Sequence, residues 1–341
     1  MSAHRLNRLR GSATAVAAVA LAATTVATSA SATAPHAQAR YVAITGNSQF
    51  LVYGEAVRTG TIDPISLGAH VSLYALGRTG NPISLGEAGP ASLISLSRNN
   101  LVVATTHGHT RHVRWWNLAN GTHSNTATSE HVVGATPNGW LFEVNRENGT
   151  HLMSHTFAGD LTDLGVPLTS GVDYSVISGP DGVVAFANNF ENNNGAISYT
   201  PYAHPSRQRM LLASGTTDNT CNSVTSSFAA CVLGSGVHRT VALFPLNGHQ
   251  PTLTASACPW DVSVWGSRVA WVVRDTRDDC STKNAAAMGR SGVVVFSTDT
   301  FNPIASTVAL GRLIVSSPGQ RMLETLTGPR AKPRPLRRAT V

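Results

Sequence analysis

The sequence is poor in charged and aromatic residues, and its only lysines are Lys283 and Lys332. Asp, Glu, Lys and Arg together make up 13% of the 341 residues, and Phe, Trp and Tyr make up 6%. Beyond the first 32 residues no apolar run approaches the length of about 18 residues that a membrane-spanning helix needs. We therefore expect no membrane span in the mature chain, and the Ala-rich, Lys-poor composition indicates a GC-rich bacterial source.

The short motifs that identify common reactions are also missing. There is no Gly-x-Ser-x-Gly nucleophile elbow, no His-Glu-x-x-His pair and no Gly-rich phosphate loop with lysine. A catalytic site would have to be assembled from residues far apart in the chain, so the sequence identifies no catalytic residue and predicts no cofactor.

The net charge of +7 comes from the two ends of the chain. Without residues 1–39 and 328–341, 17 basic and 18 acidic residues remain. A body close to neutral lacks the basic face that phosphate binding requires, so we expect no nucleic-acid partner. Residues 328–341 are basic and Pro-rich, and we expect a disordered tail with at most weak electrostatic contact to anionic envelope polymers.

The first residues have the pattern of a Sec signal peptide. Arg5, Arg8 and Arg10 precede an Ala/Val-rich stretch from Gly11 to about Ala32, and small-x-small cleavage sites end at Ala32 and Ala39. The interpretation adopted is a signal peptide over residues 1–39 and an extracellular mature chain from Arg40. A retained membrane anchor is the alternative.

A polar turn followed by a short apolar strand recurs along the mature chain. The strands after these turns begin at Phe50, Leu101, Trp140, Val183, Phe228 and Val269, at spacings of 51, 39, 43, 45 and 41 residues. That spacing is typical of one four-stranded propeller blade. A third strand of alternating or aromatic character follows each, beginning at Val71, Val113, Leu152, Ala196, Thr240 and Val293. Leu313 begins the hairpin of a further, incomplete unit.

The repeats predict an all-β chain that forms a β-propeller over residues 40–327, with six or seven four-stranded blades and the last one incomplete. Closure into a ring buries the apolar faces of every sheet and removes long sheet edges. A β-sandwich is the alternative. The turn Gly179-Pro180-Asp181-Gly182 and the repeat length resemble those of TolB-type and WD-repeat propellers, and this resemblance implies a fold but no activity.

All four cysteines lie in the fifth and sixth repeats of a chain expected to be exported, so we expect disulfides. Cys221 and Cys231 lie symmetrically about the predicted hairpin tip at Ser226, which places them opposite each other on paired strands. The pairing predicted is Cys221 to Cys231 and Cys258 to Cys280. Zinc binding is disfavoured, because the chain lacks close Cys-x-x-Cys spacing.

The loops between second and third strands share one face with the connections between blades, and a ligand site is expected there. His107, His109 and His112 lie within six residues on one such predicted loop and could ligate a divalent metal. A solvated polar loop is the alternative. Glu191, in an Asn-rich turn, and Asp275, in a mixed-charge cluster, are candidate ligand-binding residues, and so is Trp260, as an exposed aromatic platform.

These observations favour a secreted or envelope-associated binding or scaffolding propeller whose loops hold a protein, peptide or glycan at the cell surface. The alternative is an extracellular enzyme, a metal-assisted lyase or hydrolase with its site at the mouth of the ring. It requires ionisable groups from different blades to converge.

Overall fold

The computed structural model describes residues 41–56, 71–89, 92–107, 110–168, 174–189, 194–213, 219–234, 238–274, 284–288, 293–294, 305–316, 324–326 and 334–335. All of them belong to one compact unit, Ala37–Val341. Within that part of the chain no helix has the length and hydropathy of a membrane span. The signal-peptide prediction falls on residues outside this description.

The described residues form seven four-stranded antiparallel sheets, numbered here 1 to 7 along the chain, each built from four consecutive strands. Sheets 1 to 3 contain β1 (Tyr41–Gly46), β2 (Phe50–Ala56), β3 (Val71–Gly77), β4 (Ile83–Ala88); β5 (Leu93–Ser97), β6 (Asn100–His107), β7 (Thr110–Asn117), β8 (His123–Thr128); and β9 (His131–Thr136), β10 (Gly139–Arg146), β11 (Gly149–Thr156), β12 (Leu161–Asp163).

Sheets 4 to 7 follow the same order. They contain β13 (Tyr174–Ser178), β14 (Gly182–Asn189), β15 (Asn194–Pro201), β16 (Arg209–Leu212); β17 (Thr220–Val224), β18 (Phe228–Leu233), β19 (His238–Pro245), β20 (Thr252–Ala257); β21 (Pro259–Trp265), β22 (Arg268–Arg274), β23 (Asn284–Met288), β24 (Val293–Val294); and β25 (Ala305–Ala309), β26 (Arg312–Ser316), β27 (Glu324–Leu326), β28 (Arg334–Pro335). A 3-10 turn, η1 (Pro205–Arg207), precedes β16.

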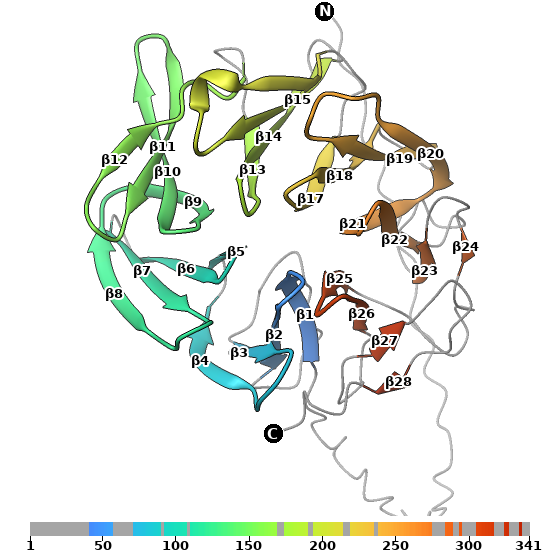
Figure 1. Cartoon of the computed structure of the whole chain (residues 1–341), viewed down its shortest axis with the longest axis horizontal. Coiled ribbons are helices and arrows are strands. Elements are labelled where there is room, and N and C mark those ends of the chain that lie inside the picture. Colours follow the sequence, from blue (N-terminus) through green and yellow to red (C-terminus); the bar gives the residue numbers. More distant parts are fainter. Residues whose placement is uncertain are drawn as a thin grey trace, which may run out of the picture. The chain divides into compact units, whose positions relative to one another are not determined.

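The sheets are arranged in a ring with their first strands around the centre and their fourth strands outside, which confirms the predicted β-propeller (Figure 1). Each apolar strand used as a repeat marker is the second strand of its sheet. In β6, Leu101 and Val103 pack toward sheet 1, whereas Val102 and Ala104 pack toward sheet 3. Because both faces of this strand are buried, its sequence is a continuous apolar run. Runs of this kind are the markers from which the blade repeat was predicted.

Each of the seven sheets is built from its own four consecutive strands, so sheets 7 and 1 share no strand. The ring therefore closes by side-chain packing between these two sheets. Leu51 and Tyr53 of β2 form a buried cluster with Ala309 and Ile314 of sheet 7. The backbone N–H of Leu310 donates to the Asn47 carbonyl oxygen, N to O 2.8 Å. Figure 1 shows β1 and β2 in blue beside β25 and β26 in red.

Some strand predictions were wrong in detail. The third strand of sheet 6 is β23, and the strand at Val293 is the fourth, β24. The sequence Asn-Ala-Ala-Ala-Met of β23 lacks the β-branched and aromatic residues that indicate a strand, so it was missed. Two residues of the stretch expected to be a disordered tail form β28, which pairs with β27 and completes sheet 7.

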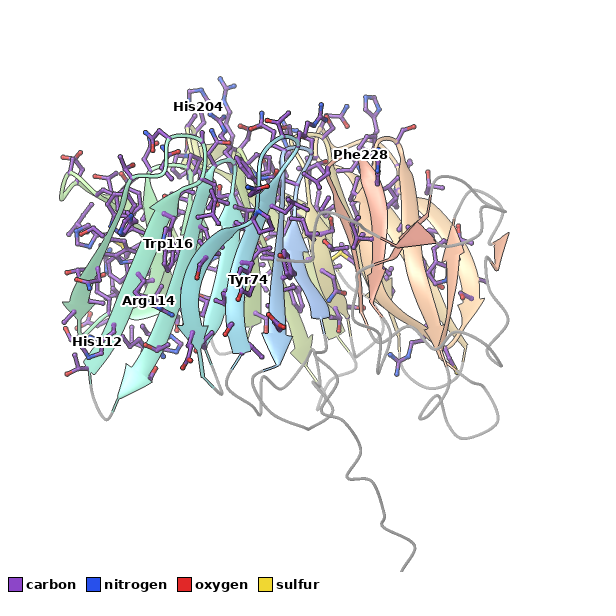
Figure 2. All side chains as sticks on the ribbon, turned by 90° about the horizontal axis from the view of Figure 1, so that it is seen from below. Tyr74, His112, Arg114, Trp116, His204 and Phe228 are labelled. Atoms are coloured by element: carbon purple, nitrogen blue, oxygen red, sulfur yellow. A yellow bond between two sulfur atoms is a disulfide. The ribbon has the colours of Figure 1, made fainter. Side chains whose placement is uncertain are left out.

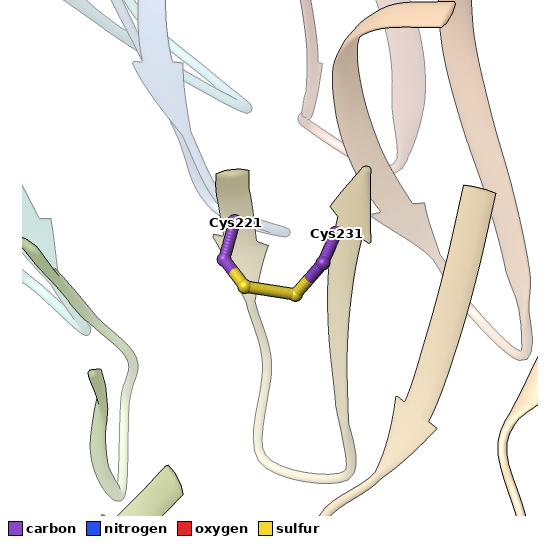
Figure 3. The surroundings of a disulfide bond; sticks show 2 residues. All are labelled: Cys221 and Cys231. Carbon is purple, nitrogen blue, oxygen red and sulfur yellow. A yellow bond between two sulfur atoms is a disulfide. The ribbon is translucent and has the colours of Figure 1, made fainter. Parts of the chain in front are cut away.

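The predicted disulfide between Cys221 and Cys231 joins the first and second strands of sheet 5 (Figure 3). The two residues are directly opposite in the β17–β18 register and are buried among the side chains between sheets 4 and 5. Cys258 is disulfide-bonded as well. Its predicted partner, Cys280, lies outside the described residues.

Candidate functional site at the loop end of the ring

Successive antiparallel strands divide the connections between the two ends of the ring. The turns between first and second strands and between third and fourth strands lie at one end, here called the turn end. The connections between second and third strands and between sheets lie at the other, the loop end. Figure 2 shows His204 and Phe228 at the turn end and His112 toward the loop end.

Hydrogen bonds between sheets join the turns of the turn end. The Ser97 hydroxyl donates to the Gly179 carbonyl oxygen, Oγ to O 2.7 Å. Arg98 donates through Nε to the Pro180 carbonyl oxygen, at 3.0 Å, and forms an ion pair with Asp181. Sheet 2 is thereby tied directly to sheet 4. Asn47 of sheet 1 adds a bond from Nδ2 to the Arg98 carbonyl oxygen, 2.6 Å.

The ion pair makes acid stability depend on Asp181. Hydrogen bonds from Ser226 and Arg98 and the charge of Arg98 outweigh desolvation and lower the pKa of Asp181 from 3.8. A carboxylate whose pKa is lower in the folded state stabilises above its unfolded pKa, and this contribution is lost as pH falls through the folded value. We expect Asp181→Asn to lose less stability than the wild type between pH 4 and pH 2, measured as urea midpoints. Parallel acid profiles of the two proteins would contradict this role.

At the loop end, four polar side chains from three sheets converge: Arg111 of β7, His131 of β9, Glu143 of β10 and Tyr174 of β13. We call them the loop-end cluster. His131 and Tyr174 are the first residues of their strands, and Glu143 is directly opposite His131 in the β9–β10 register. Arg111 enters from sheet 2 and donates through Nη1 to the Val132 carbonyl oxygen, 2.8 Å.

The centre of the cluster is an imidazole–carboxylate pair. His131 Nδ1 lies 2.7 Å from Glu143 Oε2. A carboxylate only accepts hydrogen bonds, so Nδ1 carries the proton and Nε2 of the neutral ring is an acceptor. The His131 side chain is 56% exposed and the Glu143 side chain 20%. The carboxylate therefore orients an imidazole that a ligand in solvent can reach.

Charge and burial shift the pKa values of the two flanking residues. Burial of the phenol, and then the negative charge of Glu143, raise the pKa of Tyr174. Desolvation lowers the pKa of Arg111, and Glu143 opposes that shift. Tyr174 therefore stays a neutral hydrogen-bonding group at neutral pH and Arg111 stays a cation. The cluster can accept a proton or hydrogen bond at His131 and offers charges of both signs close by.

Sheet 3 holds two further imidazole–carboxylate pairs, and both are more closed. His151 Nδ1 lies 2.9 Å from Asp163 Oδ2, and its side chain is only 10% exposed. Burial raises the pKa of Asp163, but hydrogen bonds from His151 and Gly165 and the nearby charges bring it below its ordinary value. His155 Nδ1 lies 2.9 Å from Glu130, which also accepts from Trp140 Nε1 at 2.6 Å. The His151–Asp163 pair holds the outer strand β12 to β11. Glu130, which lies between the last strand of sheet 2 and the first strand of sheet 3, is held against sheet 3 by His155 and Trp140.

Two of the three histidines predicted to lie on one loop, His107 and His112, are strand residues. His107 is the last residue of β6 and is opposite Thr110, so Thr105–His107 and Thr110–His112 are paired strands. His112 is an exposed residue of β7. The side chain of His107 and all of His109 lie outside the description, so the metal prediction itself stays open. Among the residues that can be described, no group of three His, Cys, Asp or Glu side chains could hold a metal ion.

The other predicted ligand residues are described only in part. Trp260 is the second residue of β21, on the inner strand of sheet 6, and its side chain is not described. Asp275 and Glu191 lie outside the described residues. Sequence reasoning missed the loop-end cluster because its members come from three sheets. The one available signal was Glu143, a carboxylate between the apolar residues Trp140-Leu141-Phe142 and Val144.

No protein-family model and no curated protein matches the chain. Solved structures with a similar arrangement of strands include the β-propeller domain of the Trilobed protease from Pyrococcus furiosus, with a TM-score of 0.57 and 6% identity over 88% of this chain and 95% of that one. The acylaminoacyl peptidase of Pyrococcus horikoshii aligns with a TM-score of 0.56 and 7% identity over 86% and 52% of the two chains. A prolyl endopeptidase aligns with a TM-score of 0.54 and 10% identity over 88% and 48%.

The chain spans about half the length of these last two enzymes. At such identities the likeness concerns the fold, and it places this chain structurally among the β-propellers.

Proposed function

We propose that this chain is an exported binding propeller that holds a protein, peptide or glycan at its loop end. The observation that carries the proposal is the loop-end cluster, where His131 is exposed and is oriented by Glu143. The opposite end supports the same choice, because its turns are joined from sheet to sheet. A ligand there would have to displace those bonds.

Export is part of the proposal. The buried disulfide of sheet 5 supports it, because such bonds persist in oxidising compartments. Expression of the full chain in a secreting bacterial host should deliver a product to the medium that begins at Arg40, identified by N-terminal mass spectrometry. Recovery of a full-length chain in the cell membrane would instead favour a retained anchor.

Among the possible ligands, peptides have the most support. The similar solved structures include a propeller domain of a protease and two kinds of peptidase. Trp260, Asp275 and Glu191 remain proposed contacts, and we propose no permanently bound cofactor. A divalent metal at His107, His109 and His112 is the weaker alternative.

A ligand screen tests the binding site. The oxidised chain is heated with unstructured peptides, cell-wall glycan fragments, Zn, Ni and Ca, or EDTA, and a ligand of the native state raises the unfolding midpoint. We expect His131→Ala and Glu143→Gln to weaken binding of the ligand found by about tenfold or more, which corresponds to about 1.4 kcal/mol. The first change removes the exposed imidazole, and the second replaces the charged acceptor of the His131 Nδ1–H by a neutral amide that can also present its NH2 group.

The matched control is His123→Ala, which removes an exposed histidine of the outer strand β8 and should leave the ligand-induced shift unchanged. A ligand that binds wild type, His131→Ala and Glu143→Gln equally well would place the site elsewhere. A metal-specific shift that disappears in a His107→Ala/His109→Ala double variant would favour the metal site.

An extracellular lyase or hydrolase is the second candidate, and the same imidazole–carboxylate pair favours it. Nε2 of an imidazole held in one tautomer can act as a general base. Turnover of a polysaccharide or small ester that is lost in His131→Ala, while the ligand still binds, would establish catalysis. Binding without turnover leaves the binding propeller as the function.

A further inference from the structure

The fourth strand of each sheet presents a backbone edge to the outside, and the seven edges differ in how well they are protected. Short length, charge and bulges are the usual protections against pairing with another chain. The strands β12, β16, β24 and β28 contain four residues or fewer. In β4 the edge carries Glu87 and an irregular register beside Gly86, which has φ +78°.

The strands β8 and β20 have none of these protections. Each has six residues, carries no Asp, Glu, Lys or Arg, and follows its neighbour in unbroken antiparallel register. Figure 1 shows both on the outside of the ring. They differ in one respect: β8 begins with His123, whereas β20, Thr-Leu-Thr-Ala-Ser-Ala, contains no ionisable side chain.

The side chains of β20 add an apolar contribution. Leu253 is 57% exposed, and it lies opposite Ala242, whose side chain packs toward sheet 4. Thr254 lies opposite Val241, which packs toward sheet 6. The edge thus presents one large apolar side chain among small and β-branched ones, a composition that suits pairing with another strand.

We propose that β20 pairs with β20 of a second copy of this chain across a twofold axis, which extends sheet 5 into the same sheet of its partner. A twofold axis makes two identical strands antiparallel, the arrangement already present throughout the sheet. The strand has no charge to repel its own copy. Residues 40–327 as a whole are nearly neutral, with 17 basic and 18 acidic residues. This surface is separate from the loop-end cluster.

The small size of the contact predicts weak association. A pair of six-residue strands with one exposed leucine from each copy buries less than the roughly 1,600 Å² of a standard interface. The dimer should therefore dissociate on dilution, and its formation should respond to a single change at the edge.

Sedimentation equilibrium of the oxidised exported chain over a range of concentrations tests the proposal. We expect the wild-type mass to rise toward that of a dimer and Leu253→Lys to weaken association by about tenfold or more, because it sets two like charges at the paired edge. Ala255→Lys, at another exposed position of the same strand, is the second variant and should act in the same way.

Two lysine variants at other edges serve as controls. Leu161→Lys changes a leucine of matched exposure, 59%, on the short strand β12, and Ser124→Lys places the same charge on β8. Both should associate like the wild type, and urea midpoints confirm that each variant is folded.

A wild-type chain that stays monomeric at every concentration overturns the proposal, as does equal loss of association in Leu161→Lys. Loss in Ser124→Lys alone would assign the contact to β8. A monomeric chain that binds a synthetic Thr252–Ala257 peptide would mean that the edge takes an extended segment of another protein.

Discussion

Replacement of both Cys221 and Cys231 by alanine should lower the free energy of unfolding by about 3 kcal/mol. This is the free-energy equivalent of the conformational entropy that a crosslink between residues ten apart removes from the unfolded chain. Both residues are buried between sheets 4 and 5, so the loss of two sulfur atoms adds to that cost. Urea unfolding of the oxidised proteins measures the difference.

Chemical reduction of the same bond provides an independent comparison, but reduction of the wild type would break more than one disulfide. Because Cys258 is in a separate disulfide, a Cys258→Ala/Cys280→Ala variant is needed to isolate the bond of sheet 5. In that background, reduction should destabilise the chain by about the same 3 kcal/mol as removal of Cys221 and Cys231. A difference below about 1 kcal/mol would mean that the unfolded chain is already constrained around this hairpin.

Gly139→Ala should destabilise the chain by about 3 kcal/mol or more, because an added Cβ would meet backbone that cannot rotate away. It would overlap the His155 carbonyl oxygen and lie 2.8 Å from the Cα of Thr156, both in the neighbouring strand β11. Sheet 3 would have to separate locally, and the bond from Asn100 Nδ2 to the Gly139 carbonyl oxygen, 2.8 Å, would be strained with it.

Gly54→Ala is the control, since its Cβ would approach only side-chain atoms of Ile44 and Val71, at 3.3 and 3.4 Å. We expect a cost of about 1 kcal/mol or less there. Similar thermal midpoints for the two variants would show that β10 and β11 can shift apart at low cost.

Much of the fold could be predicted because the second strands of sheets 1 to 5 are buried on both faces. Their apolar runs, each after a polar turn, are visible at Phe50, Leu101 and Phe228 without any knowledge of the partners. The third strand of sheet 6 was missed because Asn284–Met288 has no such signal. Its place depends on pairing with β22, which local composition does not encode.

The candidate site was less accessible from the sequence, for a different reason. Arg111, the His131–Glu143 pair and Tyr174 come together only when sheets 2, 3 and 4 take their places in the ring. Of the four, only Glu143 stands out within its own segment. The histidines from His107 to His112 attracted attention because they are close in sequence. In the structure His107 ends β6 and His112 lies in β7, on either side of the connection that contains His109, and the metal prediction stays open. Such a local cluster of histidines carries no information on residues that meet from different sheets.

The construction of every sheet from four consecutive strands makes the repeat a modular unit of inheritance. A duplicated or deleted segment of one repeat length would change the number of sheets in the ring and leave the strand pairing inside each remaining sheet intact. Circularly permuted chains that begin at another connection between sheets would likewise keep all seven sheets whole. Such rearrangements would keep the loop-end cluster intact, provided that sheets 2, 3 and 4 remain neighbours in the same order.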